Sequence, residues 1–230
     1  MRVALLPCLL CSAVLLFSCK KSRDDQSQDD TKSVLIKDLA GDTGASLTDG
    51  VDGKEQRPFR VFLFKLKGQQ QTWLRTAADS AQWLKTADWD LAFTGIYNSE
   101  VYANNGSITG NPGYGSTARA QVVMIDRPYA QITEAPDDAT FNASGIKNIG
   151  QETSGNTAGW FNYNLSTHLV QPIKNRTFVL KLPDGKYAKL ELQNVYKGNP
   201  PVVTDLYWPA PYFTFRYFIQ EDGSRNLVTQ

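Results

Sequence analysis

The sequence predicts an all-β fold with mostly antiparallel sheet and at most one or two short helices. Short runs alternate apolar and polar residues with a period of two, as strands with one buried face do. Two runs contain their own reversal, Pro-Asp-Gly at residues 183–185 and Asp-Gly at residues 222–223, and both are turn sequences typical of hairpins. Strands that follow one another without intervening helices favour antiparallel pairing over βαβ units.

The clearest strands fall in four segments after residue 56. The first, residues 57–68 (RPFRVFLFKLKG), places Phe62, Phe64 and Leu66 on one face. The same alternation recurs in residues 117–126, 176–196 and 212–228. We therefore expect each segment to supply one apolar face to a shared core.

One short segment has helical spacing, because Ala77, Ala81 and Leu84 recur at intervals that place them on one helix face. Two longer segments interrupt the strand pattern. Residues 104–117 are rich in Gly and Asn and are expected to form a mobile loop, and residues 137–159 form a second polar stretch. Loops of this length in a compact domain are either disordered or functional.

The N-terminal residues predict export and lipid anchoring. Arg2 precedes an apolar run of 15 residues, Val3 to Phe17, which is shorter than the ~20 residues of a membrane-spanning helix. Residues 16–19 (LFSC) resemble a bacterial lipobox. We expect residues 1–18 to be a signal peptide and Cys19 to carry the lipid anchor; the alternative is an ordinary cleaved signal followed by an incidental cysteine.

The segment after Cys19 is expected to connect the membrane to a single domain. Residues 20–33 contain no apolar residue and cannot contribute to a core, so residues 19–33 are predicted to be the acylated cysteine and a disordered tether. Residues 34–230 are then one β domain. The acidic stretch 24–30 loosely resembles a signal for export to the cell surface in Bacteroidetes-type bacteria, and a soluble spacer explains it equally well.

The charge balance argues against nucleic acid as a partner. Loss of residues 1–18 removes one arginine and no acidic residue, so the 24 Lys+Arg become 23 against 23 Asp+Glu. A neutral domain without a basic stripe lacks the charge that binding to phosphates requires.

The residue inventory excludes several kinds of site. Cys8 and Cys11 leave with the signal peptide and Cys19 is acylated, so the mature domain would have no disulfide, zinc–thiolate site or cysteine nucleophile. His168, in an apparent strand at residues 162–172, is the only histidine. A site with two or three histidines is therefore excluded, and a Ser-His-Asp triad would depend on His168 alone.

Six segments between about residues 58 and 220 form a distinctive series. The most specific are WDLAF at residues 89–93 and RTFVLKLPDGKYAKL at residues 176–190. The others are residues 118–124 (ARAQVVM), 129–136 (YAQITEAP), 159–164 (GWFNYN) and 212–220 (YFTFRYFIQ). In order and spacing this series resembles the HmuY-like lipoproteins.

The resemblance implies a mostly β, right-hand-shaped fold that binds haem at one end on the surface of anaerobic bacteria. It further implies that the protein is not an enzyme and passes haem to a TonB-dependent outer-membrane receptor. Family members use two histidines or two methionines as axial ligands. This sequence offers no second histidine, and the insertion that carries one ligand in the prototype is shortened between Pro136 and Trp160.

Haem iron takes axial ligands from His, Met, Tyr or Cys, and apolar walls must cover the porphyrin. In the mature domain His168 and Met124 are the soft or nitrogen candidates, so a mixed His168/Met124 pair is the hypothesis. Met124 follows two valines in an apolar strand, where methionine often fills the core. Tyr114, Tyr129 and Tyr163 are the fallback ligands, while Trp160, Phe161 and Tyr163 could form the pocket walls or could simply be core residues.

Three functions remain open. The first is a surface-exposed outer-membrane lipoprotein that binds haem for iron acquisition. The second is a lipoprotein of the same fold that binds a protein or glycan without haem, for example through Trp208. The third is a hydrolase with paired carboxylates such as Asp88 and Asp90, but such residues beside a tryptophan are usually turn or capping groups. We expect the first.

Overall fold

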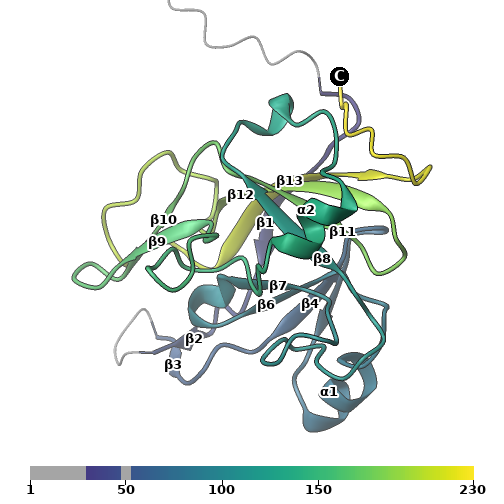
Figure 1. The fold of residues 1–230 in the computed structure, drawn as a ribbon. Coiled ribbons are helices and arrows are strands. Elements are labelled where there is room, and N and C mark those ends of the chain that lie inside the picture. Colours follow the sequence, from purple (N-terminus) through teal and green to yellow (C-terminus); the bar gives the residue numbers. More distant parts are fainter. Residues whose placement is uncertain (1–29, 48–52) are drawn as a thin grey trace, which may run out of the picture.

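The computed structural model describes residues 30–47 and 53–230 (Figure 1). The predicted signal peptide, Cys19 and most of the predicted tether lie outside the described residues. Within them, two larger antiparallel sheets and two small ones account for the architecture, together with a few short helices. The all-β prediction is confirmed.

The first sheet has five strands in the order β1-β13-β12-β11-β8, and every neighbouring pair is antiparallel. The hairpin β11–β12 turns at residues 183–185, as the Pro-Asp-Gly sequence predicts. The strands are β1 (Val34–Ala40), β8 (Gln121–Ile125), β11 (Thr177–Lys181), β12 (Tyr187–Asn194) and β13 (Tyr212–Gln220).

The second sheet has four antiparallel strands in the order β5-β4-β6-β7. They are β4 (Phe62–Lys65), β5 (Gln70–Trp73), β6 (Leu91–Thr94) and β7 (Glu100–Ala103). A small antiparallel sheet pairs β9 (Phe161–Asn164) with β10 (Leu169–Pro172), and a small parallel sheet pairs β2 (Ala45–Ser46) with β3 (Glu55–Gln56).

Aromatic rings join the two larger sheets. Phe62 stacks on Phe93 with their centroids 4.6 Å apart, and Phe93 meets Phe213 edge-on at 4.8 Å. Phe64 contacts Phe215 at 5.4 Å in the same layer. All five rings are almost completely buried, so the alternating phenylalanines of β4, β6 and β13 form the centre of the core.

The helices are short, as expected. Helix α1 (Ala77–Trp83) begins with a capping box in which Thr76 and Asp79 satisfy each other's backbone amides. Helix α2 (Asp138–Ala143) lies in the polar stretch 137–159, where Asp137 caps it by accepting from Thr140 N. Two 3₁₀ turns complete the set, η1 (Ile96–Asn98) and η2 (Tyr129–Gln131).

The loop at residues 104–117 is folded onto the sheet by its own asparagines. Asn105 Nδ2 donates to Ala120 O at 2.6 Å, and Asn111 Nδ2 donates to Ala103 O at 2.8 Å. Both side chains are buried. The prediction of a mobile loop overlooked this internal hydrogen bonding, in which side-chain amides replace ladder partners.

The histidine region also differs from the sequence-based expectation. Residues 162–172 form a hairpin, β9–β10, and His168 is the last residue of its turn with φ 56°. The prediction of a continuous strand around His168 was therefore wrong, because the chain reverses direction after Asn164.

Part of the predicted tether also differs from expectation. Thr31 donates its backbone N–H to Thr229 O at 3.2 Å, so this part of the tether packs on the domain.

Candidate ligand-binding site

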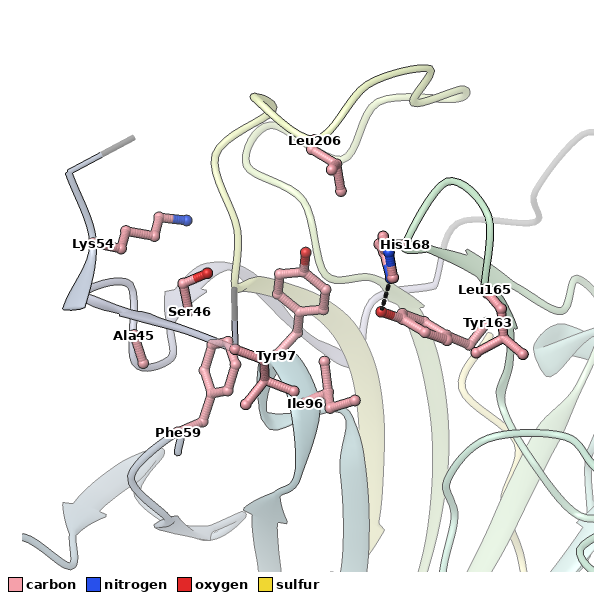
Figure 2. Close-up of a pocket in the computed structure, with 11 residues that line it drawn as sticks. Ala45, Ser46, Lys54, Phe59, Ile96, Tyr97, Tyr163, Leu165, His168 and Leu206 are labelled. Atoms are coloured by element: carbon pink, nitrogen blue, oxygen red, sulfur yellow. Dashed lines mark hydrogen bonds between the residues drawn. The ribbon is translucent and has the colours of Figure 1, made fainter. Parts of the chain in front are cut away.

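A pocket of about 260 Å³ lies where four segments meet: the β2–β3 region, the β6–β7 loop, the β9–β10 hairpin and the loop before β13 (Figure 2). Its lining is mainly apolar and aromatic. The residues are Ala45, Ser46, Leu47, Lys54, Phe59, Ile96, Tyr97, Tyr163, Leu165, His168 and Leu206. The pocket contains the chain's only histidine.

Asn164 shapes the hairpin turn that presents His168. Its Oδ1 accepts the backbone N–H groups of Ser166 at 2.9 Å and Thr167 at 3.0 Å, and its carbonyl accepts from His168 N at 2.7 Å. These bonds hold His168 in the left-handed region, which is uncommon for residues other than glycine. The turn thereby projects the imidazole into the pocket instead of along the strand.

One ring nitrogen of His168 is engaged and the other is not. His168 Nδ1 lies 3.1 Å from the Tyr163 hydroxyl (Figure 2). Nε2 has no hydrogen bond within the part of the chain that the structure describes. A hydrogen bond at one imidazole nitrogen fixes the ring and leaves the other available for a metal. The pair can therefore act as an oriented nitrogen ligand.

The β6–β7 loop brings Ile96 and Tyr97 to the same pocket. The loop starts at Gly95, with φ 69°, where an added Cβ would lie 2.7 Å from Glu100 Cγ. Tyr97 and Asn98 then both adopt positive φ, at 53° and 56°. Such backbone conformations persist only where surrounding contacts determine them.

Asn98 supplies those contacts. It is fully buried, its Nδ2 donates to Arg60 O at 2.8 Å and its Oδ1 accepts from Asp42 N at 2.8 Å. Ser99, the next residue, accepts from Trp160 Nε1 through its carbonyl at 2.7 Å. The loop is thus hydrogen-bonded to three separate parts of the chain, and these contacts fix the backbone on the C-terminal side of Tyr97.

Asp42 extends this network to the segment that carries Phe59. It pairs with the Arg57 guanidinium and accepts from Arg60 N at 2.8 Å. Burial would raise the pKa of Asp42, but the hydrogen bonds from Arg57 and Arg60 lower it below its usual value. The carboxylate therefore stays ionised and holds the Phe59 segment against the Tyr97 loop.

Aromatic rings and one cation complete the pocket. Phe59 packs against Tyr97 with ring centroids 5.5 Å apart. Burial raises the pKa values of both Tyr97 and Tyr163, so both phenols keep their protons at neutral pH. Lys54 lines the pocket and donates from Nζ to Ala210 O at 3.1 Å, which leaves its charge available to an anionic group.

Met124 lies elsewhere. It is half-buried in β8 opposite Phe178, and it borders a different pocket between β8 and α2. The structure therefore does not bring Met124 and His168 together. Of the predicted fallback tyrosines only Tyr163 lines the histidine pocket, whereas Tyr129 is in the interior and Tyr114 is on the surface.

The structure also locates the predicted aromatic wall residues and one of the paired carboxylates. Trp160 and Phe161 are buried core residues, so only Tyr163 of the predicted wall reaches the pocket. The carboxylate of Asp90 pairs with Lys65 Nζ at 2.9 Å and accepts from Leu66 N at 2.8 Å. Asp90 is thus a structural residue, and no group of three or more His, Cys, Asp or Glu within residues 30–47 and 53–230 could hold a metal ion.

The donor set is compatible with haem. It includes an oriented imidazole, apolar and aromatic walls, and a lysine that could pair with a propionate. The volume is slightly below the ~300–1,000 Å³ of typical ligand pockets, so a porphyrin would extend beyond the pocket into solvent. Sequence reasoning found His168 and Tyr163 but missed Tyr97, Phe59 and Lys54.

The chain is a mostly antiparallel β protein with a mainly apolar pocket that contains a single imidazole. The model of the HmuY protein family matches residues 54–206, and the chain belongs to this family. The sequence-based recognition is confirmed. A comparison with curated proteins gave no match. No helix in the described part of the chain is long and apolar enough to cross a membrane.

Three solved structures are similar at low identity. A protein of Bacteroides vulgatus described as HmuY-like and heme-binding is 16% identical, with 81% of this chain and 90% of that chain covered and a TM-score of 0.38. A Bacteroides fragilis protein described as a lipoprotein is 14% identical, with coverages of 81% and 87% and a TM-score of 0.37. The apo HmuY analog of Tannerella forsythia is 14% identical, with coverages of 82% and 95% and a TM-score of 0.37.

Proposed function

We propose that this protein is a haem-binding lipoprotein for iron and haem acquisition, without catalysis of its own. The observation that carries the proposal is His168, which lines a mainly apolar pocket, has Nδ1 hydrogen-bonded to Tyr163 and has no hydrogen bond at Nε2 within the described residues. Membership of the HmuY family supports the same ligand. Haem, once bound, would supply an iron centre that accepts a nitrogen ligand.

Within this proposal His168 is the axial ligand that the geometry favours. Met124 was the second candidate from the sequence, but it borders another pocket. Its replacement by leucine would remove the sulfur and keep most of the volume, and so would test its part separately from that of His168.

The location and the partner belong to the proposal as well. Acylation at Cys19 would anchor the chain to the outer membrane, and export to the cell surface would place it beside a TonB-dependent receptor that takes up the haem. The lipobox resemblance at residues 16–19 supports the anchor, and the family supports the transfer. Substitution of Cys19 by serine is expected to release the protein from the membrane fraction.

The direct test is titration of purified residues 24–230 with hemin in oxidised and reduced form, followed by absorbance. Saturable formation of a sharpened Soret band at one hemin per chain is the expected result. A spectrum that remains that of free hemin would reject haem as the ligand.

A haem-independent interaction module is the second candidate, and the exposed apolar residues around the pocket favour it. Leu165 is 78% exposed at the hairpin tip, and Tyr207 is 74% exposed in the loop before β13. Exposed apolar surface marks a contact site where it is contiguous, and here Leu165 lines the pocket while Tyr207 follows Leu206, which also lines it. This function predicts binding to a protein or glycan that depends on these residues and is unaffected by hemin.

A further inference from the structure

We propose that Tyr97 contacts the bound haem complex from the side opposite His168 and donates a hydrogen bond there, while His168 alone coordinates the iron. The inference rests on the proposed function and adds which residue contacts the haem on the side away from His168. It predicts a site with one protein ligand and one phenol donor.

Among the residues that line the pocket, backbone geometry distinguishes these two. Tyr97 and His168 both have positive φ, at 53° and 56°, and both line the same pocket. Each such residue costs stability, and such conformations concentrate at ligand sites where neighbouring contacts hold them. Here Asn98 holds one and Asn164 holds the other.

The two side chains approach the pocket from different elements. Figure 2 shows the Tyr97 ring rising from the β6–β7 loop beside Phe59, with its hydroxyl directed toward Leu206. His168 enters from the β9–β10 hairpin on the other side of the drawing, together with Tyr163. A flat ligand between them would meet an imidazole on one face and a phenol on the other.

The available chemistry favours donation over a second coordinate bond. The pocket lining in the described residues contains no methionine, cysteine or second histidine. The Tyr163 hydroxyl is already used at His168 Nδ1. Burial raises the pKa of Tyr97, which favours the neutral phenol, a hydrogen-bond donor and a weak metal ligand. One coordination position would then remain open to a small anion.

Fluoride binding to the ferric complex tests this arrangement. Wild type, Tyr97→Phe and the control Tyr114→Phe are loaded with hemin and titrated with fluoride by absorbance. Tyr114 is suited as the control because the same hydroxyl is removed from a surface position that does not line this pocket. We expect wild type and Tyr114→Phe to bind fluoride equally, and Tyr97→Phe to bind it about 10-fold more weakly, because a hydrogen bond to an anion is lost.

The other outcomes are distinguishable. Equal fluoride affinity in all three proteins would overturn the role of Tyr97 and leave haem binding intact. A wild-type hemin complex that does not take up fluoride would also overturn the inference, since a second protein ligand would then close the site. Absence of any hemin complex, seen before fluoride is added, would overturn both the inference and the proposed function.

Discussion

The position of His168 depends on neighbouring side chains more than on burial. The residue is exposed, yet its backbone is fixed by Asn164 and its ring by Tyr163. A ligand can therefore reach Nε2 without a rearrangement of the core. The sequence made His168 a candidate through its uniqueness, but it did not reveal the turn that aims it, because the flanking residues alternate as a strand does.

Tyr97, in contrast to His168, could not be recognised as a site residue from the sequence. Its neighbours Gly95 and Asn98 indicate a turn, but nothing local indicates that Asn98 would be buried against Arg60 and Asp42 and so fix the tyrosine in the pocket. That role arises from contacts between residues 38 and 56 positions apart in the sequence. Long-range contacts of this kind are not encoded in periodicity.

Lys189 is a buried charge with a structural role. Its side chain is fully buried in β12, and Nζ donates to Ile132 O at 3.0 Å and Thr229 Oγ1 at 3.3 Å. Nζ also lies 4.3 Å from the centre of the Tyr129 ring. Burial lowers its pKa from 10.5 to about 8; the charge of Arg216 lowers it further, and the charge of Asp30 offsets only part of the effect.

The pKa of Lys189 predicts a pH dependence. Between about pH 8 and pH 10.5 the unfolded chain binds this proton and the folded chain does not, so stability rises with pH in that window. We expect the free energy of unfolding of wild type, relative to Lys189→Met, to increase by up to about 3 kcal/mol across it. Urea unfolding of both proteins at several pH values measures this difference, and parallel curves would contradict it.

At the scale of elements, the β9–β10 hairpin is a two-stranded unit whose turn carries the ligand candidate. The pair has only four residues in each strand. Isolated hairpins of this size are marginal in water, so its turn hydrogen bonds and its contacts with the core determine whether it is formed. Val170 N, for example, donates to the buried Tyr196 hydroxyl at 2.9 Å.

Substitution of Asn164 by alanine tests that dependence. The turn would lose the acceptor of Ser166 N and Thr167 N, so we expect a loss of about 1 kcal/mol in the free energy of unfolding and weaker hemin binding. The matched control is Asn162→Ala, which removes an exposed amide of the same strand without a hydrogen bond in the described structure. Equal effects of both substitutions on hemin affinity would show that the turn does not position His168.

The elements were predictable where local patterns dominate. The alternation in β4 and the Pro-Asp-Gly turn of β11–β12 locate strands correctly, and the Ala77/Ala81 spacing locates α1. Helix α2 was missed because Asp137 starts only six helical residues in a polar stretch. Short elements depend on their caps and on packing more than on periodicity.

At the scale of the whole molecule, the chain enters the domain far from the pocket. Figure 1 shows the first described residues beside the C-terminal end, at the top, while β9 and β10 lie at the left and β2 and β3 at the lower left. Thr31 and Thr229 are hydrogen-bonded, which fixes this arrangement. The point where the chain enters the domain and the pocket therefore lie apart in the described structure.

Residues 30–33 are expected to stabilise the domain. Ser33 Oγ lies 2.8 Å from the Tyr129 hydroxyl, and Thr31 N donates to Thr229 O. We expect a protein that begins at Val34 to be about 1–2 kcal/mol less stable than one that begins at Asp30, because these bonds are lost. Urea unfolding of the two proteins measures the difference, and equal midpoints with equal slopes would show that these contacts contribute nothing.

The measurement that bears most directly on the central claim is a side-by-side hemin titration of wild type and His168→Ala. If His168 is the axial ligand, wild type gives a saturable, sharpened Soret band, and the variant shifts that band and binds hemin at least about 10-fold more weakly, equivalent to about 1.4 kcal/mol. Identical spectra and affinities for the two proteins would contradict the account, because the pocket would then bind haem, if at all, without its histidine.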